Sequence, residues 1–197
     1  MVPTLQARKQ QLVREAIWDA ATELFDKKGF DETTVDDIAQ AAGISRRSLF
    51  RYFASKNDLM AHGMMILGEG LVDVITACPA NYSPFEAVRH TVREVARRDA
   101  GNPRSRKIMA IGAKYPAARA AEVSRLPEVS DAVAKAFAGR KGCKDDVTAR
   151  VLAALTLETI FVTFRSWFEH GEEDIAATAE LVLKALGRVV CEQKKKV

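Results

Sequence analysis

Apolar residues recur at helical spacing along almost the whole chain, and no segment shows the alternation typical of a strand. The clearest pattern lies at residues 33–59, where polar side chains occupy one face of a short segment. Its apolar face is formed by Val35, Ile38, Ala39 and Ala42. This spacing predicts a short amphipathic helix, and a second helical pattern follows it within a few residues.

The ends of these two helices are marked by residues that cap or stop a helix. Thr34 precedes the first helix and Asp37 follows three positions later, which is the spacing of a capping box. Gly43 ends the first helix, because glycine adopts a left-handed backbone without a Cβ penalty. Ser45 caps the second helix, whose first turn carries two arginines. Two short helices joined by a glycine turn predict a helix-turn-helix.

The remainder of the chain is also helical by pattern, so we expect an all-α protein of about nine helices. Pro127 should kink or split its helix, because proline has no N–H and clashes with the preceding turn. The segment at 145–169 is apolar nearly all round, which predicts burial on nearly all sides. The other expected helices lie at residues 8–28, 55–75, 84–99, 104–114, 117–138 and 172–193.

Composition and charge narrow the range of functions. The 197 residues carry a net charge of +4, and residues 1–62 hold nine basic and nine acidic side chains. Contact with nucleic acid must therefore depend on where the charges lie rather than on bulk basicity. The sequence has no run of 18 uncharged apolar residues and no signal-peptide core. These features favour a soluble cytoplasmic protein without a membrane partner.

Residues that typically form metal, cofactor or catalytic sites do not occur at the required spacing. Cys78, Cys143 and Cys191 are far apart, and no histidine has a carboxylate or cysteine at metal-ligand spacing. A Ser-His-Asp order and a phosphate-binding glycine loop are also absent. We therefore expect no enzyme activity, no metal and no cofactor.

One segment of the chain resembles the N-terminal DNA-binding domain of the TetR family of bacterial transcriptional regulators. It is the run from Leu24 to Leu59, LFDKKGFDETTVDDIAQAAGISRRSLFRYFASKNDL. The resemblance implies a helix-turn-helix DNA-binding domain at residues 1–54 and a helical effector-binding and dimerisation domain at residues 55–197. It also implies three partners: double-stranded operator DNA, a small-molecule effector and a second copy of the chain.

The resemblance assigns DNA contacts to the helix-turn-helix. Arg46, Arg47 and Ser48 occupy the positions that read bases, although an exposed arginine pair that serves only solubility is the alternative. Phe50 stands where the family often has tyrosine, so it can touch a thymine methyl group but cannot donate to a phosphate. Phosphate contacts are expected from Thr34, Ser45, Tyr52 and Lys56.

Large apolar side chains in the C-terminal part are candidates for two further roles. The resemblance implies that the last two helices pair with those of a second copy, through Phe168, Val182, Leu186 and Val189. Methionine and aromatic side chains line permissive pockets, but they fill cores equally well. With that alternative open, the candidates for binding an effector are Met65, Met109, Tyr115, Phe137, Phe161, Phe164 and Trp167.

The function implied by the resemblance is a repressor that binds a palindromic operator as a dimer. A small apolar, aromatic or acyl-type effector would release it from the DNA, although the family also includes activators. An architectural DNA-binding protein of the same fold, with a solid core and no effector, is the main alternative. An all-helical enzyme is a more distant one, since no catalytic constellation is present.

Overall fold

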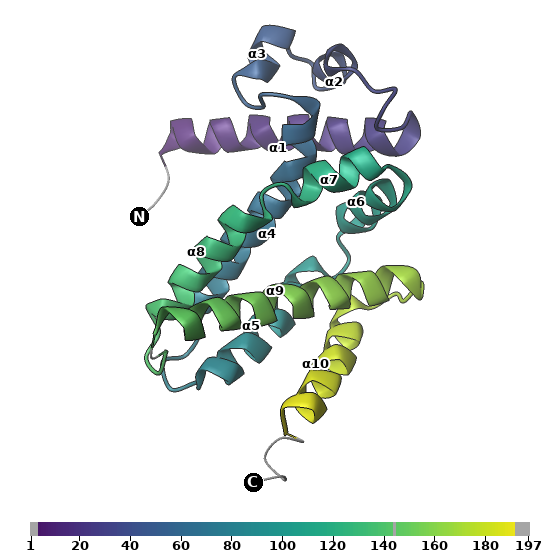
Figure 1. Ribbon diagram of the computed structural model, residues 1–197. Helices are drawn as coiled ribbons and strands as arrows, with labels where there is room; N and C mark the ends of the chain where they lie inside the picture. The colour runs from purple at the N-terminus through teal and green to yellow at the C-terminus, as the bar shows by residue number, and fades with distance from the viewer. Residues whose placement is uncertain (1–3, 144, 192–197) are drawn as a thin grey trace. The chain divides into compact units, whose positions relative to one another are not determined.

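The computed structural model describes residues 4–143 and 145–191 (Figure 1). In those residues it contains ten helices and no strand, which confirms the expected all-α class. The helices are α1 (Leu5–Lys27), α2 (Val35–Ala41), α3 (Arg46–Phe50), α4 (Lys56–Ala77), α5 (Pro84–Asp99), α6 (Pro103–Lys114), α7 (Pro116–Val123), α8 (Leu126–Ala138), α9 (Asp146–Glu169) and α10 (Ile175–Cys191).

The number of helices exceeds the expected nine because residues 117–138 form two helices rather than one. Helix α7 ends at Val123, and α8 begins at Leu126, one residue before Pro127. Proline in a first turn removes no helical hydrogen bond, because the first N–H groups of a helix have no partner within it. The predicted break at Pro127 is confirmed.

The chain divides by packing into two compact units. Unit 1 consists of Met1–Met65 with Arg104–Arg125, and unit 2 consists of Ile66–Pro103 with Leu126–Val197. Unit 1 therefore holds α1 to α3, the first turns of α4, and both α6 and α7. These units are defined by contacts, and the functional division between residues 54 and 55 stays a prediction.

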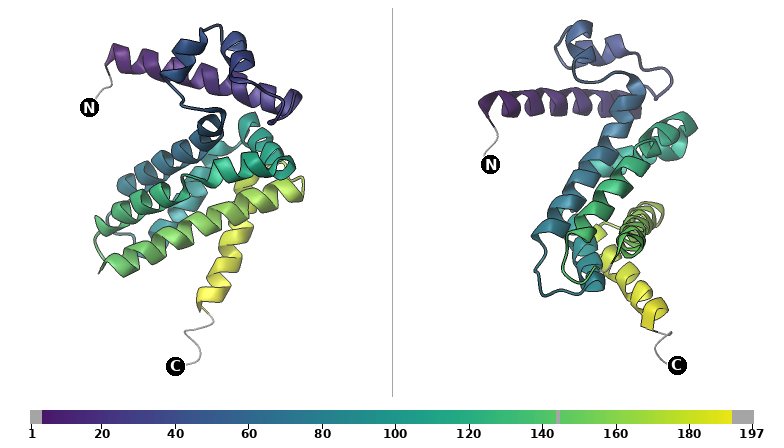
Figure 2. Two further views of the ribbon diagram at one scale, coloured as in Figure 1. Left: turned by 45° about the horizontal axis from the view of Figure 1, so that its top comes forward. Right: turned by 60° about the vertical axis from the view of Figure 1, so that its left-hand side comes forward.

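One apolar core fills unit 1. Helix α1 contributes Trp18 and Phe25, α2 contributes Ile38, and α3 contributes Leu49, all of them buried. Helices α6 and α7 reach the same core from much later in the chain, for example through Ile111. Within this unit, α1 lies between the α2–α3 pair and the α6–α7 pair (Figures 1 and 2). Helices α6 and α7, although distant in sequence, therefore pack on the side of α1 opposite α2 and α3.

The helix-turn-helix has the local structure that the sequence predicts. The hydroxyl of Thr34 accepts a hydrogen bond from the Asp37 N–H at 3.1 Å, and the Asp37 carboxylate accepts one from the Thr34 N–H at 2.8 Å. Gly43 has a φ of +68°, in the left-handed region that favours glycine. Ser45 then caps α3 by accepting from the Ser48 N–H at 3.1 Å. Side chains therefore fix the first turn of both helices.

Helix α9 is central to unit 2, where it packs against α5, α8 and α10. Its inner face buries side chains such as Leu157 and Ile160. Its outer face stays open, since the exposed fractions of Val147 and Val151 are 71% and 60%. The prediction that this helix is buried on nearly all sides is therefore wrong for the single chain. Within unit 2, none of the described helices covers the outer face.

Two of the helices in residues 4–143 and 145–191 are long and apolar enough, by length and composition alone, to cross a bilayer. They are α4 and α9, and 44% of the most apolar window of each is buried within the structure. Core helices of soluble proteins pass the same test, so two such helices are weak evidence for a membrane protein.

Replacing Gly43 with valine should lower the free energy of unfolding by about 1–2 kcal/mol, because a left-handed backbone is strained for a residue with a Cβ atom. A Cβ atom at this position meets no other atom within 4 Å, so the loss comes from the backbone and not from crowding. Chemical denaturation measures the difference. Asparagine tolerates this conformation, so Gly43→Asn is the control and should lose less. Wild-type stability in the Gly43→Val protein would contradict the left-handed turn.

Candidate nucleic-acid interface

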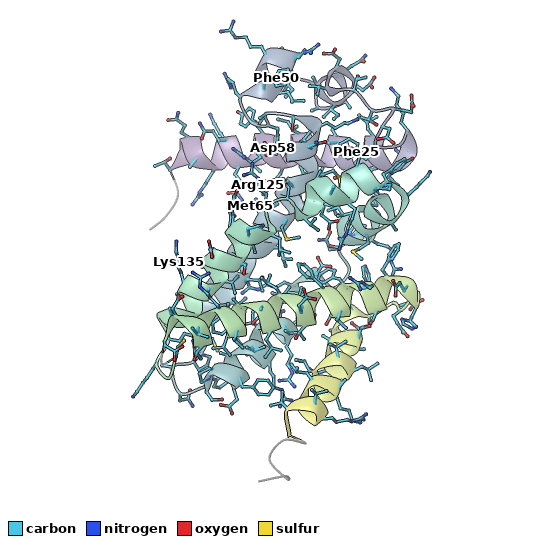
Figure 3. All side chains as sticks on the ribbon, viewed as in Figure 1. Phe25, Phe50, Asp58, Met65, Arg125 and Lys135 are labelled. Carbon is cyan, nitrogen blue, oxygen red and sulfur yellow. The ribbon has the colours of Figure 1, made fainter. Side chains whose placement is uncertain are left out.

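Helix α3 has a buried inner face and a basic outer face. Leu49 is fully buried and anchors the helix in the core of unit 1. Arg46, Arg47 and Phe50 are exposed, and Figure 3 labels Phe50 on this helix. Two cations and an aromatic ring thus project from an element of the size that a DNA major groove admits.

Arg46 is held on two sides, although its side chain is exposed. Its Nη1 lies 2.9 Å from Oδ2 of Asp36, which stands in the first turn of α2. Its guanidinium carbon lies 5.6 Å from the centroid of the Phe50 ring, one turn further along α3. The carboxylate and the ring therefore restrict where this arginine points.

Two of the hydroxyls expected to bind phosphates, those of Thr34 and Ser45, already serve as helix caps. Thr34 bonds both the N–H and the carboxylate of Asp37, and the Ser45 hydroxyl lies 3.0 Å from that of Ser48. The Lys28 ammonium, 2.7 Å from the Asp37 carboxylate, holds the pKa of that carboxyl well below its usual value, and the hydrogen bonds from Thr34 act in the same direction. A phosphate contact from either hydroxyl stays a prediction.

Lys56 has a structural role that the sequence did not reveal. Its Nζ donates to the carbonyl oxygens of Phe30 at 2.7 Å and Asp31 at 3.2 Å, in the turn between α1 and α2. The same ammonium lies 4.5 Å from the centroid of the Phe30 ring. Lys56 therefore ties α4 to that turn, and its predicted contact with phosphate is untested.

Arg51 and Asp36 complete this surface and were missing from the predicted set. Arg51 is exposed at the end of α3, with its guanidinium 5.7 Å from the ring centroid of the half-buried Tyr52. Because Arg51 directly follows the base-reading positions, the sequence alone could have identified it as part of this surface. Asp36 could not be found in this way, because an acidic residue in a first helical turn has an ordinary explanation in the helix dipole.

The effector candidates do not gather within one unit. Met65, Met109 and Tyr115 belong to unit 1. Tyr115 packs against the core of that unit and lies so close to Gly29 that a Cβ atom there would be 2.5 Å from the tyrosine oxygen. This contact favours a packing role for Tyr115.

The remaining effector candidates belong to unit 2. Phe137 on α8 is fully buried. On α9, Phe164 and Trp167 meet edge to face with ring centroids 6.3 Å apart, and Phe161 is half-buried. The burial of Phe137 is typical of a core side chain. Contact of Phe137, Phe161, Phe164 or Trp167 with a ligand stays a prediction.

The predicted dimer residues differ in exposure. Phe168, Val182 and Leu186 are half-buried in the single chain, while Val189 is 69% exposed. Further large apolar side chains are exposed on the same two helices: Val147, Val151 and Val162 on α9, and Leu181 and Val190 on α10. These side chains leave apolar surface exposed on both α9 and α10, beyond the predicted set.

Two buried or half-buried titratable groups of unit 1 lie away from α3. Burial raises the pKa of the Glu122 carboxyl, although Arg119 donates to it at 2.8 Å and opposes the change. Burial lowers the pKa of His62, which meets Trp18 and Phe53 edge to face. Across residues 4–143 and 145–191, no three His, Cys, Asp or Glu side chains are grouped to hold a metal ion.

Two family models match the chain. The model of bacterial regulatory proteins of the tetR family matches residues 17–62, which include α2 and α3. The model of the MftR C-terminal domain matches residues 82–190, which run from α5 into α10. Together they extend the similarity well beyond the helix-turn-helix.

Curated relatives match over nearly the whole chain. The transcriptional regulator MftR of Mycobacterium tuberculosis is 31% identical over 181 residues, which is 88% of this chain and 88% of MftR. The HTH-type transcriptional regulator TcmR of Streptomyces glaucescens is 27% identical over 193 residues, which is 93% of this chain and 85% of TcmR. The similarity therefore covers most of the length of each regulator.

Solved structures share the fold. NalD of Pseudomonas aeruginosa, the secondary repressor of the MexAB-OprM multidrug efflux pump, has a TM-score of 0.64 at 22% identity, covering 91% of this chain and 96% of NalD. FadR of Thermus thermophilus, a repressor solved with lauroyl-CoA, has a TM-score of 0.52 at 27% identity, covering 88% and 92%. These likenesses confirm an N-terminal helix-turn-helix followed by a C-terminal helical domain.

Replacing Lys56 with methionine should lower the free energy of unfolding by about 1–3 kcal/mol, because two carbonyl oxygens lose a charged donor. The change should appear in chemical denaturation without any DNA present. Lys27→Met is the control, since Lys27 is largely exposed and pairs with Glu23 at 3.4 Å. Exposed ion pairs contribute about 0–1 kcal/mol, so the control should stay near the wild type. Equal stability of the two variants would contradict a structural role for Lys56.

Proposed function

The chain belongs to the TetR family of bacterial transcriptional regulators, which are DNA-binding proteins and not enzymes, and we propose that it is a cytoplasmic, ligand-responsive repressor. In this proposal two copies bind one inverted-repeat operator, and a small molecule releases them. The observation that carries it is a capped helix, α3, that exposes Arg46 and Arg47 in a chain that also exposes an apolar surface on α9 and α10.

Sequence would be read from the outer face of α3. Arg46 and Arg47 are in the first turn, and the first residues of a recognition helix are those that reach base edges. An arginine that donates two hydrogen bonds to O6 and N7 of guanine is the commonest specific contact in a major groove. Ser48 and Phe50 would contact neighbouring bases, and Thr34, Ser45, Tyr52 and Lys56 the backbone.

Dimerisation would cover the apolar surface of α9 and α10. Val151 and Leu181 are 60% and 66% exposed in the single chain, and such a surface on a soluble protein favours a partner. A second copy is the simplest partner, because a twofold interface brings the same surface of both subunits together. It would carry two α3 helices to sites roughly 34–36 Å apart, one turn of DNA. The half-buried Phe168, Val182 and Leu186 would flank the contact.

The effector would be an apolar, aromatic or acyl-type molecule. Thermus thermophilus FadR binds lauroyl-CoA, and it is 27% identical to this chain. In unit 2, the half-buried Phe161 and Phe164 with Trp167 provide aromatic surface of the kind that lines apolar sites. Phe137 is buried in the same unit, and the other predicted effector residues, Met65, Met109 and Tyr115, belong to unit 1.

An architectural DNA-binding protein that needs no effector is the second candidate. The complete burial of Phe137 and the burial of Trp167 favour it, because both side chains then serve the core. Thermal melting with lauroyl-CoA and with simple aromatic acids separates the two candidates. A rise in the melting temperature that depends on ligand concentration favours the ligand-responsive repressor.

Arg47→Ala should weaken binding of the preferred DNA duplex by about 1–3 kcal/mol and relax base preference, because a base contact is lost. The duplex is the one that the wild type selects from a randomised library, and fluorescence anisotropy measures its affinity beside that of a scrambled duplex. Arg97→Ala, which removes an exposed arginine that pairs with Glu94 on α5, is the control. Loss of affinity for both duplexes by the same factor would count against base reading by Arg47.

Val189→Glu should convert a dimer into monomers, because it places a charge on the exposed apolar surface of α10. Since Val189 is 69% exposed, the fold of the single chain should tolerate the change. A monomer binds the operator with one α3 helix instead of two, so operator binding should weaken about 100-fold or more. Analytical ultracentrifugation measures the mass, and Leu5→Glu on α1 is the control, since Leu5 is equally exposed at 71%. A wild type that sediments as a monomer and still binds its duplex tightly would contradict this architecture.

A further inference from the structure

The two helices of the helix-turn-helix are joined on their outer side by one ion pair. Nη1 of Arg46, in the first turn of α3, donates to Oδ2 of Asp36, in the first turn of α2, at 2.9 Å. The Phe50 ring lies beside the same guanidinium, 5.6 Å from its central carbon. Arg46 therefore has a carboxylate on one side and an aromatic ring on the other.

The fold does not depend on this ion pair. Both side chains are mostly exposed, at 62% for Arg46 and 63% for Asp36, and exposed ion pairs contribute little to stability. Helix α2 already has a complete capping box from Thr34 and Asp37, and Leu49 anchors α3 in the core. The main effect of the pair is therefore on the direction of the Arg46 side chain.

The chemistry of the guanidinium leaves Arg46 able to bind a base while it is held. Arginine has five N–H donors in a planar fork, and Asp36 takes a single hydrogen from Nη1. The edge formed by Nε and Nη2 can still donate two hydrogen bonds to O6 and N7 of guanine. A side chain that is already restrained loses less conformational entropy on binding than one that moves freely.

We propose that Asp36 is a positioning residue that holds Arg46 in the orientation for reading a guanine and thereby sets sequence specificity. The proposal rests on the proposed function as a DNA-binding regulator. Asp36 itself would stand near the DNA phosphates, where its charge is repelled. Removing the carboxylate should therefore increase binding to unrelated DNA while it reduces discrimination at one base pair of each half-site.

These opposite changes separate positioning from two simpler explanations. If Asp36 competes with DNA for Arg46, its removal strengthens binding to the preferred duplex and leaves discrimination intact or improved. If Asp36 acts through charge alone, its removal strengthens binding to every duplex by one factor. Loss of folding would weaken binding to all duplexes together. Loss of discrimination at a single base pair is expected from positioning alone.

The test compares Asp36→Ala with Glu32→Ala, which removes an equally charged, exposed side chain from the turn before α2. The DNA is the duplex that the wild type selects from a randomised library, together with every single-base variant and a scrambled duplex. A bidentate contact to guanine discriminates about 5- to 150-fold, so Asp36→Ala should lose about 3- to 10-fold at the base pair read by Arg46. Binding to the scrambled duplex should tighten for both variants, and Glu32→Ala should keep the wild-type base profile.

A double-mutant cycle with Arg46→Ala completes the design. In that background, Asp36→Ala should no longer change base discrimination, because the side chain that it positions is gone. A full effect there, or an unchanged base profile in Asp36→Ala alone, overturns the proposal while the proposed function stands. A wild type that selects no sequence from the library overturns both.

Discussion

Helix α3 has five residues, and a helix so short is not stable by itself in water. It keeps its conformation because Leu49 is inserted into the core of unit 1, where α1 supplies Trp18 and Phe25. The left-handed turn at Gly43 and the cap at Ser45 then fix where the helix starts. Every exposed side chain of α3 depends for its position on that one buried leucine and on those two local constraints.

Residues 104–125 support the same core from far along the sequence. Arg104 pairs with Asp19 and lies over the Trp18 ring, 4.3 Å from its centroid. Lys107 pairs with Glu23 on the same helix. Helices α6 and α7 are therefore part of the unit that carries α3, and a change in them would reach α1 through direct contacts.

Local sequence signals predicted the local structure well. The caps at Thr34 and Ser45, the turn at Gly43 and the break at Pro127 each follow from the backbone preferences of one or two residues, and the structure confirms all four. The base-reading assignment came from the family resemblance and not from these signals. It therefore stays a prediction.

Contacts between distant segments could not be predicted in this way. The packing of Tyr115 near Gly29 could not be foreseen, because helical periodicity does not say which neighbour a face meets; its predicted contact with an effector stays a prediction. The bonds from Lys56 to the carbonyls of Phe30 and Asp31 also join separate segments. The open face of α9 around Val151 was expected to be buried. An apolar pattern does not distinguish a side chain in the interior of one chain from a side chain on an exposed apolar surface.

The central claim is that two copies of α3 read one DNA site symmetrically. The most direct measurement is a hydroxyl-radical footprint of the wild-type protein on the duplex that it selects from a randomised library. The account predicts two protected regions of equal strength, related by a twofold axis and centred about one helical turn apart or slightly more. A single protected region, or protection without a fixed position on the duplex, would contradict it.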